Sequence, residues 1–198
     1  MKTFTIGKKK IVLKEEWMVG FITTWIVGLL AHAYRFFNFL PIWDSIYNFT
    51  GVGSTYTLGR WFLGYAGLIT SMFDLPWVNG AFSLFYISIV VILLTEMFEI
   101  KNKGMIVLCA AIFVSFPTVV SSFAYMYTAD AYLLAFLLAT LAVYLTWCVK
   151  KWGTIAGMVC LAFAMGIYQA YATVAIVLVL LYIIRQFVIE KLPDNKKQ

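Results

Sequence analysis

The chain has 198 residues, of which 63% are hydrophobic and 12% are charged, with a net charge of +6. Soluble domains carry about twice that share of charged residues, and one soluble core of this size cannot bury so much apolar surface. The composition therefore excludes a soluble enzyme, a disulfide-stapled secreted domain and a disordered tail. It predicts an all-α fold, a polytopic bundle of membrane helices.

The first 16 residues are basic and are expected to lie on the cytoplasmic side of the membrane. After them, charge-free stretches predict membrane-spanning helices, because each is close to the roughly 20 residues that cross a hydrocarbon core. These helices form a membrane domain over residues 17–188, followed by a cytoplasmic tail over residues 189–198. The predicted spans are residues 17–34, 75–97, 105–124, 129–149, 154–169 and 171–188.

The last two spans come from a single apolar stretch, residues 152–184, which charge placement divides. Lys150 and Lys151 precede this stretch and Arg185 follows it, and basic loops stay on the cytoplasmic side. The stretch must therefore cross the membrane twice, with a turn near residues 166–172. The resulting six spans place both termini in the cytoplasm.

With this topology, Arg35 and Arg60 are the only basic residues on the outer side. All other lysines and arginines flank the cytoplasmic ends of the spans. The net positive charge is therefore a topology signal and a contact with anionic membrane lipids. No nucleic-acid partner is expected.

The outer segment between the first two spans, residues 35–74, is long and rich in aromatic residues. Such rings favour the interface between membrane and water. Within it, residues 58–73 repeat apolar side chains at the i, i+3, i+4, i+7 spacing of a helix, with glycines and polar residues opposite. We expect one helix lying flat on the outer surface of the bilayer. A packing helix that caps the bundle is a compatible alternative.

Few ionisable residues fall on the outer side, and in a chain so poor in charge each of them needs a reason. Asp74 precedes Leu75 and Pro76, which predicts the N-cap of the second span. Asp130 opens the fourth span, where a carboxylate complements the helix dipole or serves the function; both interpretations stay open. His32 is expected to be a packing residue, and as the single histidine it excludes a multi-histidine metal site.

Asp44 follows an aromatic loop and begins no span, so it has no evident structural purpose beyond a local turn or cap through Ser45. A carboxylate in this position could accept a proton from a hydroxyl nucleophile. Arg60 lies on the small face of the predicted interfacial helix, where a guanidinium could pair with phosphate. Arg35 could do the same or anchor the first span, and Gln169 could make an interhelical bond or contact substrate.

These outer-face residues belong to a series of short motifs. In chain order the motifs are Trp43-Asp44-Ser45, Gly59-Arg60-Trp61-Phe62-Leu63-Gly64, Phe73-Asp74-Leu75-Pro76-Trp77, Phe116-Pro117-Thr118, Thr128-Ala129-Asp130 and Gly166-Ile167-Tyr168-Gln169. Each motif alone is weak, but all six in this order resemble the Gtr type II glucosyltransferase family of bacteria. Members of that family are usually much longer, so the resemblance covers their N-terminal part.

The resemblance implies a GT-C type membrane glycosyltransferase in the bacterial cytoplasmic membrane. Such enzymes move a sugar from a polyprenyl-phosphate carrier to a surface glycan, such as O antigen or a teichoic acid, on the outer face. The implied partners are therefore the lipid-linked sugar, the glycan acceptor and membrane lipids. No cofactor is expected, and the participation of a divalent cation is left open. The alternatives are a non-catalytic subunit that binds or flips the carrier lipid, and an inactive truncated fragment of such a transferase.

The resemblance also implies roles for individual residues. GT-C enzymes generally have a critical acidic residue in the first outer loop, and Asp44 occupies that place as the expected base. Asp130 is expected to be a second catalytic carboxylate that orients the acceptor. The residues expected to bind substrate are Arg60, Arg35, Trp43, Tyr168 and Gln169.

Overall fold

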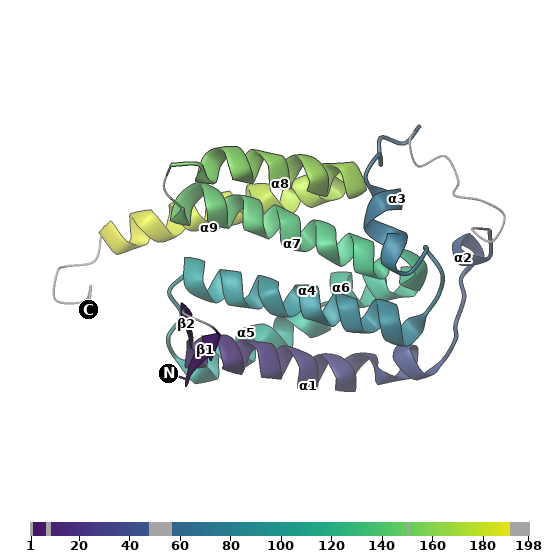
Figure 1. Ribbon diagram of the computed structural model, residues 1–198, viewed down its shortest axis with the longest axis horizontal. Helices are drawn as coiled ribbons and strands as arrows, with labels where there is room; N and C mark the ends of the chain where they lie inside the picture. The colour runs from purple at the N-terminus through teal and green to yellow at the C-terminus, as the bar shows by residue number, and fades with distance from the viewer. Residues whose placement is uncertain (1, 7–8, 48–56, 150, 191–198) are drawn as a thin grey trace.

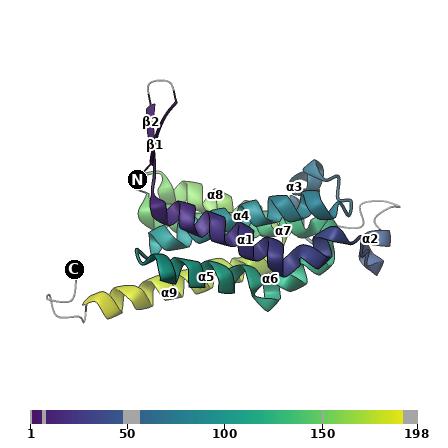
Figure 2. The same cartoon turned by 90° about the horizontal axis from the view of Figure 1, so that it is seen from below.

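The structure is a computed structural model, and it describes residues 2–6, 9–47, 57–149 and 151–190. Residues 48–56 of the outer segment and the predicted tail beyond residue 190 lie outside the described residues. The chain begins with an antiparallel hairpin, β1 (Lys2–Ile6) and β2 (Lys9–Leu13), which projects from the bundle (Figure 2). The basic composition of this segment did not predict strands.

Long helices make up the rest of the bundle and lie side by side along its long axis (Figure 1). They are α1 (Glu15–Phe37), α4 (Pro76–Met97), α5 (Lys103–Ser115), α7 (Met126–Cys148), α8 (Gly153–Ile167) and α9 (Ala172–Glu190). Each of the six predicted stretches overlaps one of these helices. The all-α helical bundle expected from the composition is confirmed.

In the described part of the chain, four helical stretches are long and apolar enough to cross a membrane. They are Glu15–Phe37, Pro76–Met97, Lys103–Cys148 and Gln169–Ile189. The third stretch contains both α5 and α7, and α8 is apolar but, at 15 residues, shorter than an ordinary span. The number of crossings and the side on which the termini lie stay predictions.

Pro117 divides the third predicted span into two helices. Because proline lacks a backbone N–H and disfavours helix in the residue before it, α5 ends at Ser115 and Phe116 is extended. Pro117 then occupies the first turn of α6 (Pro117–Ser122), which continues into η3 (Phe123–Tyr125). The polar side chains of α6 are thereby placed at the start of a new helix.

Helix α7 forms the centre of the bundle and packs against α4, α8 and α9, while α1 packs against α4 and α5. Gly153 and Gly157 explain the close approach of α8 to α7. A Cβ atom at Gly153 would lie 2.2 Å from the carbonyl oxygen of Leu145, and one at Gly157 would lie 2.7 Å from that of Ala142. The two helices can therefore pack at this distance only with glycine at these positions.

The two ends of the bundle are held in different ways. Ion pairs gather at the end where α1 begins and α9 finishes: Lys14–Glu96 at 2.7 Å, Lys103–Glu15 at 2.5 Å and Arg185–Glu99 at 3.0 Å. The opposite end carries the short elements (Figure 1): α2 (Trp43–Tyr47), α3 (Leu63–Ala66), η2 (Gly67–Ile69), η3 and η4 (Gln169–Tyr171). This second end corresponds to the predicted outer side.

The single interfacial helix predicted over residues 58–73 is shorter in the structure, since helix forms only in α3 and η2. Gly59 has a φ of +73°, and Ser71 and Met72 have φ values of 51° and 56°, so the backbone leaves the right-handed helical region on both sides. Tertiary contacts determine this path. Most of the periodic apolar side chains are exposed in the structure, so the pattern did not mark a buried helix face.

The predicted cap at Asp74 is also wrong. Leu75 is the N-cap of α4, with Pro76 in the first turn as expected. The backbone N–H of Leu75 donates to the Asn79 side chain at 2.9 Å, so a side chain from within the helix serves the N-cap residue. Both carboxylate oxygens of Asp74 are buried without a hydrogen bond.

Candidate active site

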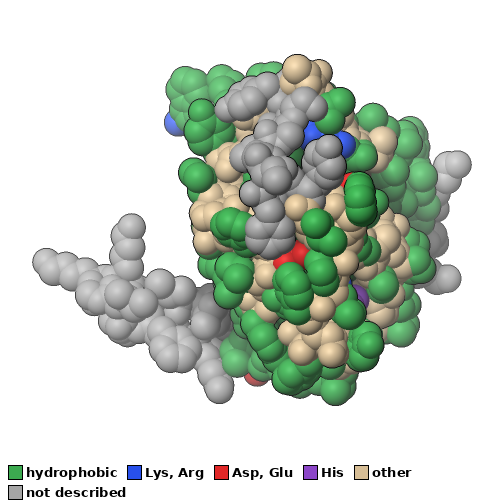
Figure 3. Space-filling model, turned by 90° about the vertical axis from the view of Figure 1, so that its right-hand side faces the viewer, with side chains coloured by type: hydrophobic (Ala, Val, Ile, Leu, Met, Phe, Trp, Pro, Cys, Tyr) green, Lys and Arg blue, Asp and Glu red, His purple; other side chains and the backbone are tan. Residues whose placement is uncertain are grey.

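A cavity of about 500 Å³ opens at the end of the bundle that carries the short elements. Its walls come from α2, the segment before α3, α6 with η3, the start of α7, and η4 with the start of α9. Figure 3 shows this end of the molecule, where a few basic and acidic side chains interrupt a largely apolar surface. The volume is in the range of small-molecule sites. Among the described residues that line the cavity, Asp44 and Arg60 are the two that are charged.

Arg60 is held in the cavity by aromatic groups. Its guanidinium carbon lies 4.5 Å from the ring centroid of Tyr168, and its Nη1 donates a long hydrogen bond of 3.5 Å to the Tyr132 hydroxyl. The Tyr132 and Tyr168 rings stack at 5.3 Å with an interplanar angle of 25°. Within the described ranges Arg60 makes no ion pair, and its Nε is buried without a hydrogen bond. The cation is thus positioned while its charge stays available to an anion.

The backbone around Arg60 is tied to the break between α8 and η4. The N–H of Phe62 donates to the carbonyl oxygen of Gly166 at 2.8 Å, and Gln169 Nε2 donates to that of Leu58, also at 2.8 Å. A Cβ atom at Gly166 would lie 2.5 Å from the Trp61 ring. Through these contacts the Gly59–Gly64 motif and the Gly166–Gln169 motif hold each other in place.

Asp44 is an exposed residue in the first turn of α2. The turn is closed by Ser45, whose hydroxyl and N–H both donate to the carbonyl oxygen of Ile42, at 2.8 and 3.1 Å. The local turn that was the structural alternative for Asp44 is therefore formed by Ser45, without the Asp44 side chain. The Asp44 carboxylate has no hydrogen bond to another described residue and lines the cavity with Arg60.

Asp130 does not lie in the cavity with Asp44 and Arg60. Its side chain is 2% exposed and accepts hydrogen bonds of 3.1 Å from Thr70 Oγ1 and from Asn79 Nδ2. It therefore ties α7 to the residue after η2 and to α4, and it does not line the cavity. The structure supports the interpretation of Asp130 as a structural residue over that of a second catalytic carboxylate.

Arg35 also lies outside the residues that line the cavity. Its guanidinium donates to the carbonyl oxygens of Phe123 at 2.8 Å and Ala124 at 3.0 Å, and to that of Leu40. It thus anchors the end of α1 to η3. Nearby, His32 is buried and its Nε2 donates to the carbonyl oxygen of Val114 at 2.9 Å, as expected of a packing residue.

Of the remaining predicted substrate-binding residues, the structure brings only Tyr168 into the cavity. Trp43 is 75% exposed and does not line it, although its neighbour Asp44 does. Gln169 acts through its bond to Leu58, outside the cavity wall. Arg60, Asp44 and Tyr168 are therefore the predicted site residues that meet in one place.

The sequence did not point to most of the cavity wall. One unpredicted group consists of phenols, from Tyr125, Tyr127, Tyr132 and Tyr171. The other consists of aliphatic hydroxyls, from Thr118, Ser121, Ser122 and Thr173. The tyrosines resemble ordinary interfacial residues at helix ends, and the hydroxyls resemble residues that satisfy backbone near a proline. Clustering of hydroxyls after Pro117 was the one available signal.

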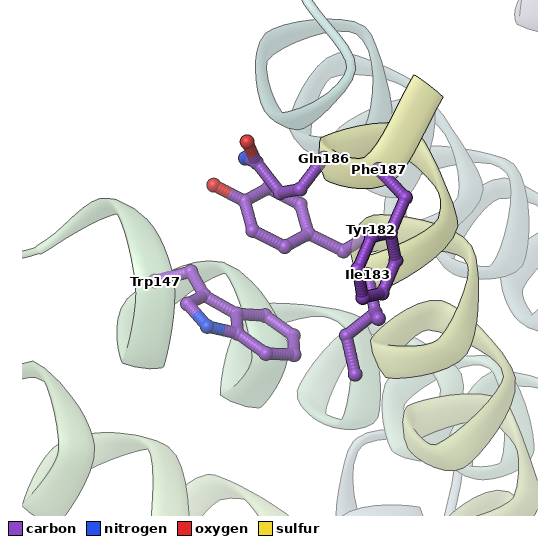
Figure 4. A pocket seen from close by; sticks show the side chains of 5 residues that line it. All are labelled: Trp147, Tyr182, Ile183, Gln186 and Phe187. Atoms are coloured by element: carbon purple, nitrogen blue, oxygen red, sulfur yellow. The ribbon is translucent and has the colours of Figure 1, made fainter. Parts of the chain in front are cut away.

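A second hollow of about 240 Å³ lies between the C-terminal half of α9 and the end of α7, as Figure 4 shows. The Trp147 and Tyr182 rings stack there at 4.6 Å, and Ile183, Gln186 and Phe187 complete the lining. None of these side chains is charged. In the ranges that the structure describes, no three His, Cys, Asp or Glu residues lie close enough to hold a metal ion. The cavity with Asp44 and Arg60 is therefore the candidate active site.

Comparison with known families agrees with the motif series. The model of the family described as glucosyl transferase GtrII matches residues 33–197, which include every residue that lines the cavity. Searches of curated proteins and of solved structures find no match. Because the matched region covers most of the chain, the protein belongs to the GtrII glucosyltransferase family.

Proposed function

We propose that the chain transfers glucose from a polyprenyl-phosphate carrier to a hydroxyl of a cell-surface glycan at the outer face of a bacterial cytoplasmic membrane. Family membership supports glucosyl transfer in a membrane context. The observation that carries the rest is the shared cavity of Asp44 and Arg60. A carboxylate and a cation with no ion pair to described residues are the two groups that this transfer requires.

The reaction forms a bond between the acceptor oxygen and the anomeric carbon, and it breaks the bond from that carbon to the phosphate oxygen. Asp44 takes the proton that the acceptor hydroxyl loses. The electron pair of the broken bond leaves with the lipid phosphate, and Arg60 stabilises the growing negative charge. Because one carboxylate lines the described cavity, a single displacement is expected, and it inverts the configuration at the anomeric carbon.

The predicted orientation in the membrane agrees with the same proposal. The ion-paired end of the bundle carries most of the basic residues, and basic loops stay in the cytoplasm. The cavity lies at the other end, where a carrier lipid on the outer leaflet could reach it. Six crossings with both termini in the cytoplasm give this arrangement.

The test is transfer by the purified full chain in lipid nanodiscs, with polyprenyl-phosphate glucose and candidate surface glycans, followed by mass measurement of the product. The Asp44→Asn variant keeps the shape of the side chain but removes the base, so transfer should fall by about 10²- to 10⁴-fold. Asp74→Asn is the matched control, because Asp74 is a carboxylate of the same outer segment that does not line the cavity.

Near-normal transfer by Asp44→Asn would refute the assignment of the base. Binding of the lipid-linked sugar without any transfer by the wild-type chain would favour the alternative of a non-catalytic carrier-binding subunit. A product that retains the configuration of the donor would exclude the single displacement.

A further inference from the structure

The aliphatic hydroxyl side chains that line the cavity come from two elements that are far apart in the chain. We name Thr118, Ser121, Ser122 and Thr173 the hydroxyl wall. The first three belong to α6 and the last to the start of α9. We infer that the hydroxyl wall is the subsite that binds the glucose of the carrier lipid, an inference that rests on the proposed function.

The hydrogen bonds of the hydroxyl wall determine what it offers to a ligand. Ser121 Oγ and Ser122 Oγ donate to the carbonyl oxygen of Thr118, at 2.9 and 3.0 Å. Thr173 Oγ1 donates to the carbonyl oxygen of Ala170 at 2.6 Å. Each of these three hydroxyls thus directs its proton to the backbone and keeps its oxygen lone pairs. The wall is therefore a surface of acceptors, which suits a ligand that carries several O–H donors.

The uncharged character of the wall also narrows the ligand class. None of its four side chains is ionisable at ordinary pH, and the phenols beside it are neutral donors and acceptors as well. A second anionic group would find no cation there, since Arg60 is the one basic residue that lines the described cavity. A neutral hexose matches both the hydrogen-bonding pattern and the lack of charge.

The position of Arg60 explains why the wall should bind the donor sugar. In the donor, a single oxygen joins the phosphorus to the anomeric carbon, so a phosphate at Arg60 places the hexose immediately beside it. The Tyr132 and Tyr168 rings lie in that neighbourhood and also line the cavity, so they add apolar surface beside the sugar. The cavity, which these rings and the hydroxyl wall both line, has a volume of about 500 Å³, enough for a hexose. The acceptor would enter past the exposed Asp44.

The experiment compares two lipids, polyprenyl phosphate and polyprenyl-phosphate glucose, by equilibrium binding to the full chain in nanodiscs. Ser121→Ala is the main variant, because the Ser121 side chain is exposed whereas that of Ser122 is half-buried. One neutral hydrogen bond corresponds to about a 2- to 10-fold change in Kd. Ser121→Ala should weaken binding of the glucosylated lipid by that factor and leave binding of polyprenyl phosphate unchanged.

Ser115→Ala is the matched control. Ser115 also donates to a backbone carbonyl in its own helix, that of Ala111 at 2.7 Å, but it lies before Pro117 and does not line the cavity. This variant should bind both lipids like the wild-type chain. Thr173→Val, which keeps the side-chain shape on the second element of the wall, should repeat the selective loss of Ser121→Ala. Arg60→Gln should weaken binding of both lipids, because it removes the phosphate contact.

Three results would overturn the inference. In the first, Ser121→Ala and Thr173→Val weaken binding of both lipids equally, or of neither. In the second, they leave the donor Kd unchanged and raise the KM of the acceptor, which would make the wall the acceptor subsite. In the third, the wild-type chain binds the two lipids with equal affinity. If the wild-type chain prefers the glucosylated lipid but transfers no glucose, the proposed function is refuted and the glucose subsite stands. Failure of the proposed function can therefore be distinguished from failure of this inference.

Discussion

Asp130 is structural according to its contacts, whereas the sequence predicted a catalytic role. The Asp130→Asn variant distinguishes these two roles. The carboxylate accepts one hydrogen bond from Thr70 and one from Asn79, both at 3.1 Å, in a position that is 2% exposed. An asparagine keeps one acceptor oxygen and replaces the other by an NH2 group. That NH2 group would then face a donor from Thr70 or from Asn79.

The expected cost is the loss of one hydrogen bond to a charged acceptor, about 1.5–3 kcal/mol in the free energy of unfolding. For a chain of this size, roughly 2–4 °C of thermal midpoint corresponds to each kcal/mol, so the midpoint should fall by several degrees. Transfer per folded molecule should change little, because Asp130 does not line the cavity.

The assay measures the thermal midpoint in detergent together with transfer per folded molecule, for Asp130→Asn, for Thr70→Val and for the double variant. Thr70→Val removes one donor from the same carboxylate, so the two losses in stability should be less than additive. A hundredfold loss of transfer with an unchanged midpoint would show that Asp130 is catalytic and would refute the structural interpretation.

Two further predictions concern the helix contacts. Gly157→Val places a Cβ 2.7 Å from the carbonyl oxygen of Ala142, so α8 must move away from α7. The free energy of unfolding should fall by about 1–3 kcal/mol. An unchanged thermal midpoint would contradict this prediction. Arg35→Gln removes the bonds to the carbonyl oxygens of Phe123 and Ala124, so hydrogen exchange in η3 should become faster while carrier binding persists. Lost carrier binding with unchanged exchange would instead make Arg35 a phosphate ligand.

The helices were predictable because charge is rare in this chain. Basic residues occur at only a few places between apolar stretches, so most of them lie near a break between helices. The division of residues 152–184 depended on this argument alone, since the stretch has no polar gap of its own. The structure places the break where charge placement required it, with α8 ending at Ile167 and α9 beginning at Ala172.

The candidate site was predictable only in part, because sequence does not reveal how a helix is rotated about its axis. Asp44 and Asp130 both looked like outer carboxylates, yet one lines the cavity and the other lies in the core. The rotation of α7 decides this, and it depends on the packing of α4 and α8 against it. The interfacial helix was overestimated for a related reason: the bonds from Phe62 to Gly166 and from Thr70 to Asp130 redirect a segment whose periodicity alone favoured one helix.

The attachment of the Arg60 segment to the α8–η4 break also affects how the site responds to thermal motion. Phe62 is bonded to Gly166 and Leu58 to Gln169, and Tyr168 lies between these two attachment points in the chain. Displacement of the outer segment therefore carries the guanidinium and the ring beneath it together. Their separation should vary less than the distance from either group to Asp44, which lies on a different element. Opening and closing of the cavity would then change the spacing of base and phosphate and leave the phosphate contact intact.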